Sequence, residues 1–353
     1  MPKRIRVLVV DDSNYVVGVV SRKLQADPEI EVIGSAGNGI EAIEKVKRLR
    51  PDVVTLDVVM PEMDGLTALG RIMLECPTPV VMLSALTSEN AISTIQALEL
   101  GAVDFFLKTS VVKSVGNEAD SLIAKIKMAA TQRLLKKPIA TPGGFTSKDK
   151  APGIRKGSIN KIVVIGSSTG GPRALTELIP ALPADIQAAI LVVQHMPPMF
   201  TKSLAERLNQ ISKIEVMEAH EGSLIIRGQA LIAPGDYHMI VGEKGKVLLT
   251  QDPPVLGVRP SVDTLMKSVA MIYKDMSLGV VLTGMGTDGT EGAACIKKAG
   301  GKILAQDEVT SAIYGMPMSV AKAGHADVIL PLNKIAEEIT RICERDKASV
   351  LAR

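Results

Sequence analysis

Residues 5–12 read IRVLVVDD, a mostly apolar, β-branched run that stops at two aspartates. Apolar runs without polar alternation are typical of strands that are covered on both faces of a parallel sheet. Similar short runs follow at Glu31–Ala36, Val53–Leu56, Pro79–Leu83 and Val103–Leu107. Helical patterns fill the intervals between these predicted strands. The helical pattern resumes from Glu118 to Leu135. Five βα units in this order predict a doubly wound α/β domain over residues 1–125, whose last helix extends toward 135.

The stretch from 136 to 158 is rich in Pro, Gly, Ser and Lys and has little to bury. This composition predicts a linker, and it fits a passive tether and a regulated hinge equally well. A second domain is expected over residues 159–350.

The second domain returns to α/β alternation. Its predicted strands are Lys161–Ile165, Ala189–Gln194, Leu278–Leu282, Lys302–Gln306 and Asp327–Leu330, and a terminal helix runs to Cys343. Short strands and tight turns between Ile214 and Thr250 predict an antiparallel excursion. We therefore expect a mostly parallel sheet with an antiparallel hairpin excursion.

Composition limits the classes of function. A chain of 353 residues suggests two domains, and a net charge of +3 with no Trp, four Tyr and four Phe lacks the aromatic platforms of single-strand nucleic-acid binding. Three widely separated cysteines fit a reducing cytoplasm. The first apolar run is too short for a signal peptide, and no run approaches a membrane span. We expect a cytoplasmic monomer with no nucleic-acid partner and no membrane insertion.

Polar residues gather at the strand ends of the first domain. Asp11 and Asp12 end the first strand, Asp57 the third, Ser84 the fourth and Lys108 the fifth. Ligands of open parallel sheets collect at the carboxyl ends of the strands, so these side chains should converge. Three carboxylates need a cation nearby, and oxygen ligands favour Mg²⁺. Ordinary polar strand ends explain one such position but not five together.

These residues, with Leu56–Gly65 (LDVVMPEMDG), closely resemble the receiver domain of bacterial response regulators over residues 4–125, a flavodoxin-like (βα)5 fold. The resemblance implies that Asp57 accepts a phosphoryl group from a histidine kinase. It also implies that Asp12, Asp57 and the backbone carbonyl of Val59 hold Mg²⁺ beside Asp11. Three further residues would respond to the phosphoryl group: Ser84, Lys108 and Phe105. The family usually has proline after the lysine, whereas this chain has Thr109.

A second motif opens the second domain. Gly166–Gly170 (GSSTG) matches G-x-S-x-G between a strand and a helix, which places Ser168 on a sharp turn at the sheet edge. Amides at the start of the following helix, such as that of Thr169, are suited to stabilise an oxyanion. The stretch lacks the Gly-Lys-Ser/Thr of a P-loop and the spacing of a dinucleotide-binding turn.

A serine nucleophile needs a base and an acid that orients the base. His195 directly follows the strand Ala189–Gln194, which predicts the same sheet edge as Ser168. Asp288 lies in the glycine-rich loop after Leu278–Leu282, where orienting the base and capping the next helix are equally good interpretations. The order Ser, His, Asp differs from that of α/β-hydrolases. The other histidines are expected to be structural or at the surface, the first two within reach of the pocket rim: His220, His238 and His325.

Four segments look like the catalytic domain of the chemotaxis protein-glutamate methylesterase: Ile165–Gly171, Gln194–Pro197, Arg259–Asp263 and Leu282–Gly289. The resemblance implies that Ser168 is the nucleophile, His195 the general base and then acid, and Asp288 the group that orients His195. The backbone near Met285 would contribute to the oxyanion site. Arg259 would either meet an acidic substrate surface or form a structural ion pair.

The two resemblances together imply a phosphorylation-activated serine hydrolase of chemotaxis. It would remove methyl groups from glutamate γ-methyl esters of chemoreceptors and deamidate selected receptor glutamines, with no cofactor for the esterase reaction. The unphosphorylated receiver would inhibit the catalytic domain by covering its catalytic edge. Two alternatives fit worse: a DNA-binding response regulator would need a compact three-helix output region, and a nucleotide-binding oxidoreductase would not need His195 and Asp288.

Overall fold

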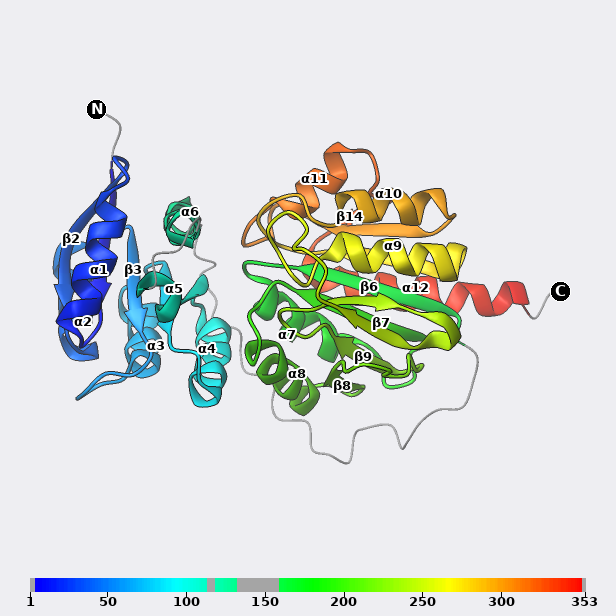
Figure 1. Ribbon diagram of the computed structural model, residues 1–353, viewed down its shortest axis with the longest axis horizontal. Coiled ribbons are helices and arrows are strands. Elements are labelled where there is room, and N and C mark those ends of the chain that lie inside the picture. Colours follow the sequence, from blue (N-terminus) through cyan, green and yellow to red (C-terminus); the bar gives the residue numbers. More distant parts are fainter. Residues whose placement is uncertain (1–3, 113–117, 132–158, 351–353) are drawn as a thin grey trace. The chain divides into compact units, whose positions relative to one another are not determined.

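The computed structural model describes residues 4–112, 118–131 and 159–350, and the chain divides into two compact units, residues 1–140 and 141–353. Figure 1 shows their elements in chain order. The predicted linker over 136–158 and the extension of the last helix of the first unit to 135 lie outside the described residues.

The first unit is a five-stranded parallel sheet in the order β2-β1-β3-β4-β5, which confirms the predicted doubly wound fold. Its strands are β1 Ile5–Val10, β2 Ile30–Ala36, β3 Val53–Asp57, β4 Val80–Ser84 and β5 Asp104–Leu107. Its helices are α1 Asn14–Gln25, α2 Gly39–Leu49, α3 Gly65–Glu75, α4 Ser88–Leu100, α5 Lys108–Val112 and α6 Glu118–Thr131.

Local chemistry explains where these helices begin. The side chains of four N-cap residues each accept a backbone N–H of the first turn, which satisfies donors that have no partner inside the helix: Ser13, Asn38, Asp64 and Thr87. The central strands β1, β3 and β4 are buried on both faces, as their uninterrupted apolar runs predict. The strand order reverses beside β1, so the loops after β1 and β3 open at the position where such sheets bind ligands.

The second unit is a seven-stranded sheet in the order β14-β13-β12-β6-β7-β9-β8, and every pairing in it is parallel. Its strands are β6 Lys161–Ser167, β7 Ala188–Gln194, β8 Glu215–Glu218, β9 Gln229–Ile232, β12 Ser277–Val281, β13 Lys302–Gln306 and β14 Val328–Leu330. Its helices are α7 Gly171–Ala181, α8 Phe200–Ile211, α9 Val262–Tyr273, α10 Thr290–Lys298, α11 Met316–Lys322 and α12 Leu332–Val350, with 3-10 turns at Glu243–Gly245 and Lys274–Met276.

The predicted antiparallel excursion is shorter than expected. Only β10 (His238–Val241) and β11 (Val247–Thr250) form an antiparallel hairpin, as a separate two-stranded sheet. The expectation was wrong for β8 and β9, which extend the parallel sheet. All four residues of β9 are buried, so it lacks the alternation of a half-exposed hairpin strand and behaves as a covered parallel strand.

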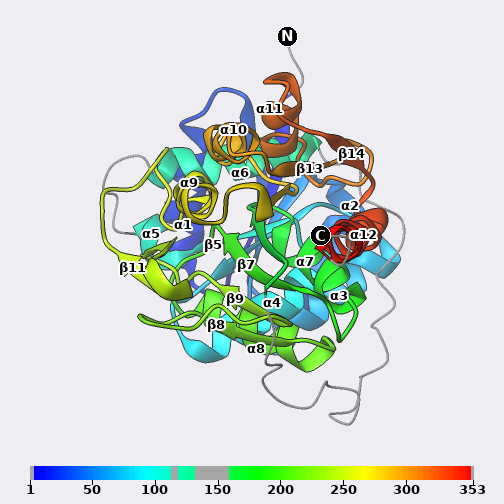
Figure 2. The same cartoon turned by 90° about the vertical axis from the view of Figure 1, so that its right-hand side faces the viewer.

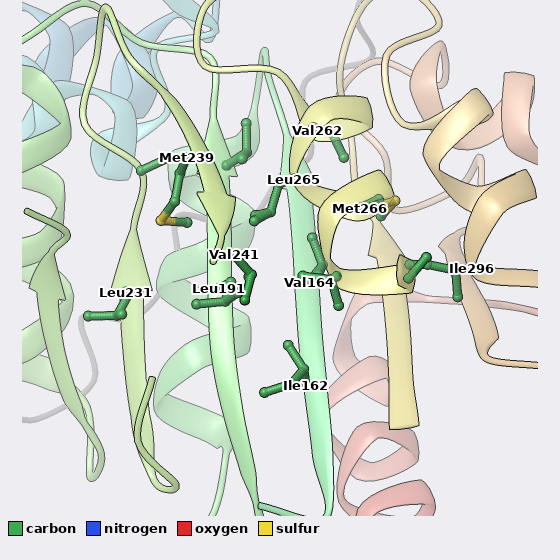
Figure 3. Packing of buried hydrophobic residues seen from close by; sticks show 14 of the residues in the cluster. Ile162, Val164, Leu191, Leu231, Met239, Val241, Val262, Leu265, Met266 and Ile296 are labelled. Carbon is green, nitrogen blue, oxygen red and sulfur yellow. The ribbon is translucent and has the colours of Figure 1, made fainter. Parts of the chain in front are cut away.

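The core of the second unit joins the sheet to α9 and the hairpin. In Figure 3, Leu265 of α9 and Val241 of β10 lie over Val164 and Leu191 of the central strands. Figure 2 shows α9 on one face of this sheet and α7 on the other. The packing of α9 and the hairpin on the sheet holds the carboxyl ends of β12, β6 and β7 side by side.

Within the described parts of the chain, no helix has both the length and the hydrophobicity needed to cross a membrane.

Candidate active site

Three loops meet at one edge of the second sheet. Strand β6 pairs with β7 and β12, up to Ser167 opposite Gln194 and Gly166 opposite Val281. The loops that follow these strands carry Ser168, His195 and Asp288. Register alone therefore brings together three residues that are far apart in the sequence.

The turn that carries Ser168 is fixed by its backbone. The Ser168 N–H donates to the Thr283 carbonyl at 3.0 Å, and the His195 N–H donates to the Ser167 carbonyl at 3.1 Å. Gly170 ends the turn with a φ of 78°, a conformation that glycine adopts without steric cost. The nucleophile turn is thus tied to the loops on both sides.

Gln194, which is buried, joins the serine turn to the histidine. Its Oε1 accepts the hydroxyl of Ser167 at 2.7 Å, and its Nε2 donates to the Ser168 carbonyl at 2.9 Å and to the His195 carbonyl at 3.2 Å. One amide therefore fixes the relative positions of Ser168 and His195.

His195 and Asp288 form a hydrogen-bonded pair. The Nε2 of His195 lies 2.8 Å from Oδ2 of Asp288. Because a carboxylate can only accept, the proton of the neutral ring lies on Nε2, and Nδ1 is the nitrogen left to act as a base. In the Ser-His-Asp template the acid holds Nδ1 and Nε2 faces the serine, so this pair uses the two ring nitrogens in the opposite sense.

Asp288 is held as a carboxylate. It accepts the hydroxyl of Ser261 and the backbone N–H groups of Val262, Asp263 and Gly289, at 2.7–3.0 Å. Burial acts to raise the pKa of Asp288, but the hydrogen bonds from His195 and from these backbone groups hold the pKa below its usual range. A charged Asp288 keeps the Nε2 proton of His195 in place.

The two interpretations of Asp288 can now be compared. The N-cap residue of α10 is Gly289, and its first-turn N–H groups, from Gly289 and Gly292, donate to Oδ1 of Asp263 at 2.9 and 2.6 Å. Asp288 also accepts the Gly289 N–H, at 3.0 Å, and its other two backbone donors, Val262 and Asp263, lie in the first turn of α9. Asp288 therefore contacts the starts of both helices while its Oδ2 bonds His195.

The loop after β12 supplies backbone donors beside Ser168. Since the Ser168 N–H is committed to Thr283, an oxyanion must find other donors. Gly284 bonds Ile313 through its N–H, whereas the Met285 N–H makes no hydrogen bond to another described residue. Thr169 is buried, and its carbonyl accepts the Thr283 hydroxyl at 3.0 Å. The Met285 amide is thus available to an oxyanion.

Arg259 is occupied by the protein itself. Its Nη2 lies 2.5 Å from Oδ1 of Asp236, and its Nη1 donates to the carbonyls of Gln251 and Asp252 at 2.9 and 3.0 Å. These contacts favour the structural ion pair over a contact with an acidic substrate.

The remaining histidines lie in different surroundings. His220 is exposed and His325 is half-buried, whereas His238 is 1% exposed and hydrogen-bonded through both ring nitrogens. The buried His238 fits the expectation of a structural histidine, whereas sequence reasoning gave no role to Ser261 or Asp263. These two lie inside the segment Arg259–Asp263, which carried part of the resemblance, so their location was the available signal.

The carboxylate cluster of the first unit is built around Lys108. Its Nζ lies 2.7 Å from Oδ2 of Asp11 and 2.7 Å from Oδ2 of Asp57. Burial raises the pKa of Asp57 to about 6, against the opposing effect of Lys108. Burial acts to lower the pKa of Lys108, but its hydrogen bonds with Asp11 and Asp57 raise it overall. The phospho-acceptor predicted from sequence is therefore a buried carboxylate with one cationic neighbour.

The cluster also suits a hard cation. Asp11, Asp12 and Asp57 each offer a carboxylate oxygen, and these oxygens lie within 4.8 Å of one another. Asp12 is exposed, so its oxygens face solvent while the other two carboxylates are buried. An all-oxygen donor set with excess negative charge is what Mg²⁺ prefers. The described residues thus fit the predicted ion.

The other predicted receiver residues, Ser84 and Phe105, contact side chains of neighbouring helices. The hydroxyl of Ser84 lies 2.9 Å from that of Thr94 on α4. Phe105 is buried, and Nζ of Lys125 lies 5.6 Å from its ring centre. Thr109, which stands where proline is usual, lies in α5, which begins at Lys108. A proline would fit that early helical position too, so the departure leaves the position of Lys108 intact.

The chain matches two family models. Residues 163–339 match the CheB methylesterase model, and residues 7–117 match the response regulator receiver domain model.

Relatives of known name cover nearly the whole chain. A protein-glutamate methylesterase/protein-glutamine glutaminase of Symbiobacterium thermophilum is 47% identical over 96% of this chain and 96% of its own length. One of Pyrococcus abyssi is 46% identical over 97% of this chain and 94% of its own length. The crystal structure of the Thermotoga maritima CheB methylesterase catalytic domain is 48% identical, covers 52% of this chain and 98% of that chain, and has a TM-score of 0.51.

Proposed function

The chain belongs to the CheB methylesterase family and carries a response regulator receiver domain, and we propose that Ser168, His195 and Asp288 are the residues with which it hydrolyses glutamate γ-methyl esters of chemoreceptors and deamidates receptor glutamines. The observation that carries this assignment is the 2.8 Å bond between Nε2 of His195 and Oδ2 of Asp288, at the edge where the Ser168 turn lies. No cofactor is needed for this chemistry.

The two ring nitrogens of His195 determine how protons move in the proposed reaction. Nδ1 of His195 takes the hydroxyl proton of Ser168 as Oγ attacks the ester carbonyl, and Asp288 stabilises the imidazolium that forms. The same proton then passes to the leaving methoxy group, and methanol departs. Water attacks the acyl-enzyme with His195 again as base, which restores Ser168 and leaves the glutamate. With a glutamine substrate, ammonia takes the place of methanol.

The oxyanion of each tetrahedral intermediate needs preorganised donors. The Met285 N–H is the donor we assign, and the amide of Thr169, in the turn before α7, is the second candidate. Such donors typically contribute about 100-fold to about 1,000-fold in rate. The tight hydrogen bonding of Thr283 to both the serine turn and Ile313 supports this assignment, because it keeps the donor loop against Ser168.

The receiver supplies the switch. We assign Asp57 as the residue phosphorylated by a chemotaxis histidine kinase, with Asp12, Asp57 and the Val59 carbonyl as Mg²⁺ ligands and Asp11 beside them. When bound, the ion neutralises charge on the transferring phosphoryl group. Lys108 pairs with the phospho-acceptor, and Ser84 and Phe105 respond to the added phosphoryl group. Phosphorylation relieves inhibition of the esterase by the receiver.

These roles divide the chain into two domains and a linker. We propose a receiver over residues 1–125, a linker over 136–158 and a catalytic domain over 159–350. The substrate is the methylated cytoplasmic region of chemoreceptors, and the enzyme works in the cytoplasm as a monomer. The free thiols of Cys76, Cys295 and Cys343 support a reducing compartment.

A methanol-release assay on methylated receptor tests substrate, reaction and switch together. The full chain should release methanol, faster with a small phosphodonor and Mg²⁺. Ser168→Ala should lose this activity, whereas removal of residues 1–145 should raise it without phosphodonor. Methanol release by Ser168→Ala at the wild-type rate would refute the assignment of the nucleophile.

A further inference from the structure

A second histidine, His238, is connected to the Asp288 carboxylate by the hydrogen bonds of one residue, Ser261. It is the first residue of β10 and is buried. Its Nδ1 accepts the Ser261 N–H at 3.2 Å, and its Nε2 lies 3.2 Å from the Pro253 carbonyl. One neighbour is a donor and the other an acceptor, so the contacts fit the neutral ring with its proton on Nε2. The ring therefore holds the backbone of Ser261 in a defined place.

Ser261 connects this ring to the catalytic acid. It is completely buried, and its hydroxyl donates to Oδ1 of Asp288 at 2.9 Å. The same oxygen accepts the Thr264 N–H at 3.3 Å as the N-cap of α9. These uses are compatible because a hydroxyl has one proton and two lone pairs. The proton of Ser261 is thus directed at Asp288.

We propose that His238 and Ser261 are positioning residues of the esterase: His238 fixes Ser261, and Ser261 holds the Asp288 carboxylate where it receives the Nε2 proton of His195. The proposal rests on the function assigned above. Asp288 uses Oδ1 for Ser261 and Oδ2 for His195, so a rotation of the carboxylate that loosens the first bond also misaligns the second.

A purely structural role for His238 can be separated from this one. Strand β10 and helix α9 are joined at a second point, where the Val241 N–H donates to the Ser268 hydroxyl oxygen at 3.0 Å. That bond joins the same two elements, but neither residue contacts Asp288. Ser268→Ala therefore removes a comparable link between hairpin and helix and leaves the catalytic acid untouched.

The experiment compares four variants of the full chain: Ser261→Ala, His238→Leu, His238→Asn and Ser268→Ala. We expect the first two to lower kcat for methanol release about 10-fold while KM stays within about twofold, because Ser261→Ala removes the bond to the charged Asp288 and His238→Leu loosens the residue that makes it. His238→Asn retains an acceptor near the position of Nδ1 and should recover most of kcat. Ser268→Ala should keep kcat even where it lowers the unfolding midpoint.

A measurement without substrate separates this proposal from the assigned function. The hydrogen-bonded imidazole proton of His195, identified in NMR spectra by its loss in His195→Gln, should shift in Ser261→Ala and His238→Leu and stay unchanged in Ser268→Ala. The proposal is overturned if Ser261→Ala leaves both kcat and this resonance unchanged, or if Ser268→Ala reproduces its effects. A wild-type chain that releases no methanol refutes the function alone, since the resonance still decides the positioning role. If His238→Leu does not fold, Ser261→Ala decides.

Discussion

Asp263 and Asp288 each cap the helix that begins beside the other. Asp288 accepts the N–H groups of Val262 and Asp263 at the start of α9, and Asp263 accepts those of Gly289 and Gly292 at the start of α10. Both carboxylates are buried. Burial and the charge of Asp288 raise the pKa of Asp263 to about 6, while the N–H groups of Gly292 and Gly289 oppose this. The charged form of Asp263 is thus destabilised in the folded protein by burial and by the neighbouring Asp288.

Asp263→Asn should therefore stabilise the protein above pH 6. Between pH 3.8 and about 6 the folded chain keeps a proton on Asp263 that the unfolded chain has lost, so the stability from this group falls as the pH rises through that window. The pKa of Asp288 is lowered instead, so protonation of this group changes the stability only below pH 3.8. We expect a gain of about 1–3 kcal/mol at pH 7.5 that shrinks toward pH 4. Denaturant unfolding at both pH values measures it; an equal gain at both contradicts the assignment.

Asp288→Asn should lower kcat by about 1,000-fold to about 10,000-fold with little change in fold. An NH2 group in place of Oδ2 donates to Nε2 of His195, which moves the ring proton to Nδ1 and removes the base that we assign to Ser168; it also loses the bond from the Val262 N–H. Steady-state methanol release and circular dichroism together check this outcome. A loss of less than tenfold would show that Asp288 mainly caps α9.

Gly171→Ala should disturb the nucleophile turn. A Cβ on Gly171 would lie 1.9 Å from Oε1 of Gln194, so the Gln194 amide must move and release Ser167 and the Ser168 carbonyl. We expect kcat to fall at least about 10-fold, because small misplacements of reacting groups are costly. Gly70→Ala is the control, since a Cβ there meets nothing within 4 Å. Equal activity of the two variants would show that Gln194 is dispensable.

Asp57→Asn should abolish activation by a phosphodonor and leave basal turnover of the esterase intact. The substitution removes the phospho-acceptor oxygen but touches no group of the catalytic domain that we assign to the reaction. The ratio of methanol release with and without phosphodonor measures the effect. Activation that survives in Asp57→Asn would place the phosphorylated residue elsewhere.

Magnesium binding to the receiver should weaken as the pH falls below about 6. The pKa of Asp57 near 6 means that the carboxylate is charged at pH 7.5 and about nine-tenths protonated at pH 5, where a proton competes with the ion. We expect apparent affinity to fall about tenfold between these pH values, as read by isothermal titration. Asp57→Asn should bind weakly at both. Affinity that is independent of pH would exclude Asp57 as a ligand.

The sequence predicted well which residues lie at the edges of the two sheets, because the strand positions alone determine this. Apolar runs located β1, β3, β4, β6 and β7 to within a residue or two, and residues directly after parallel strands must emerge at one edge. Ser168 and His195 were placed at the same edge in this way, as the pairing of Ser167 with Gln194 shows. The parallel pairing of β8 and β9 was missed, because short strands separated by turns fit both directions until burial is known.

The support around Asp288 was beyond sequence reasoning. The bonds from Ser261 and the backbone of Val262 depend on how α9 packs against the loop before α10, a contact between segments more than 25 residues apart. A buried His238 has the same appearance in sequence as a surface one. Only the packed structure shows which polar groups face each other.

The position of β6 between β7 and β12 has a consequence during synthesis. The last residue of the proposed site, Asp288, lies 93 positions after His195, and its loop follows β12, which pairs with β6. A chain still emerging from the ribosome therefore carries the receiver strands and the Ser168 turn before the loop of Asp288 is made. The order of the strands delays assembly of the proposed catalytic residues until translation has passed β12.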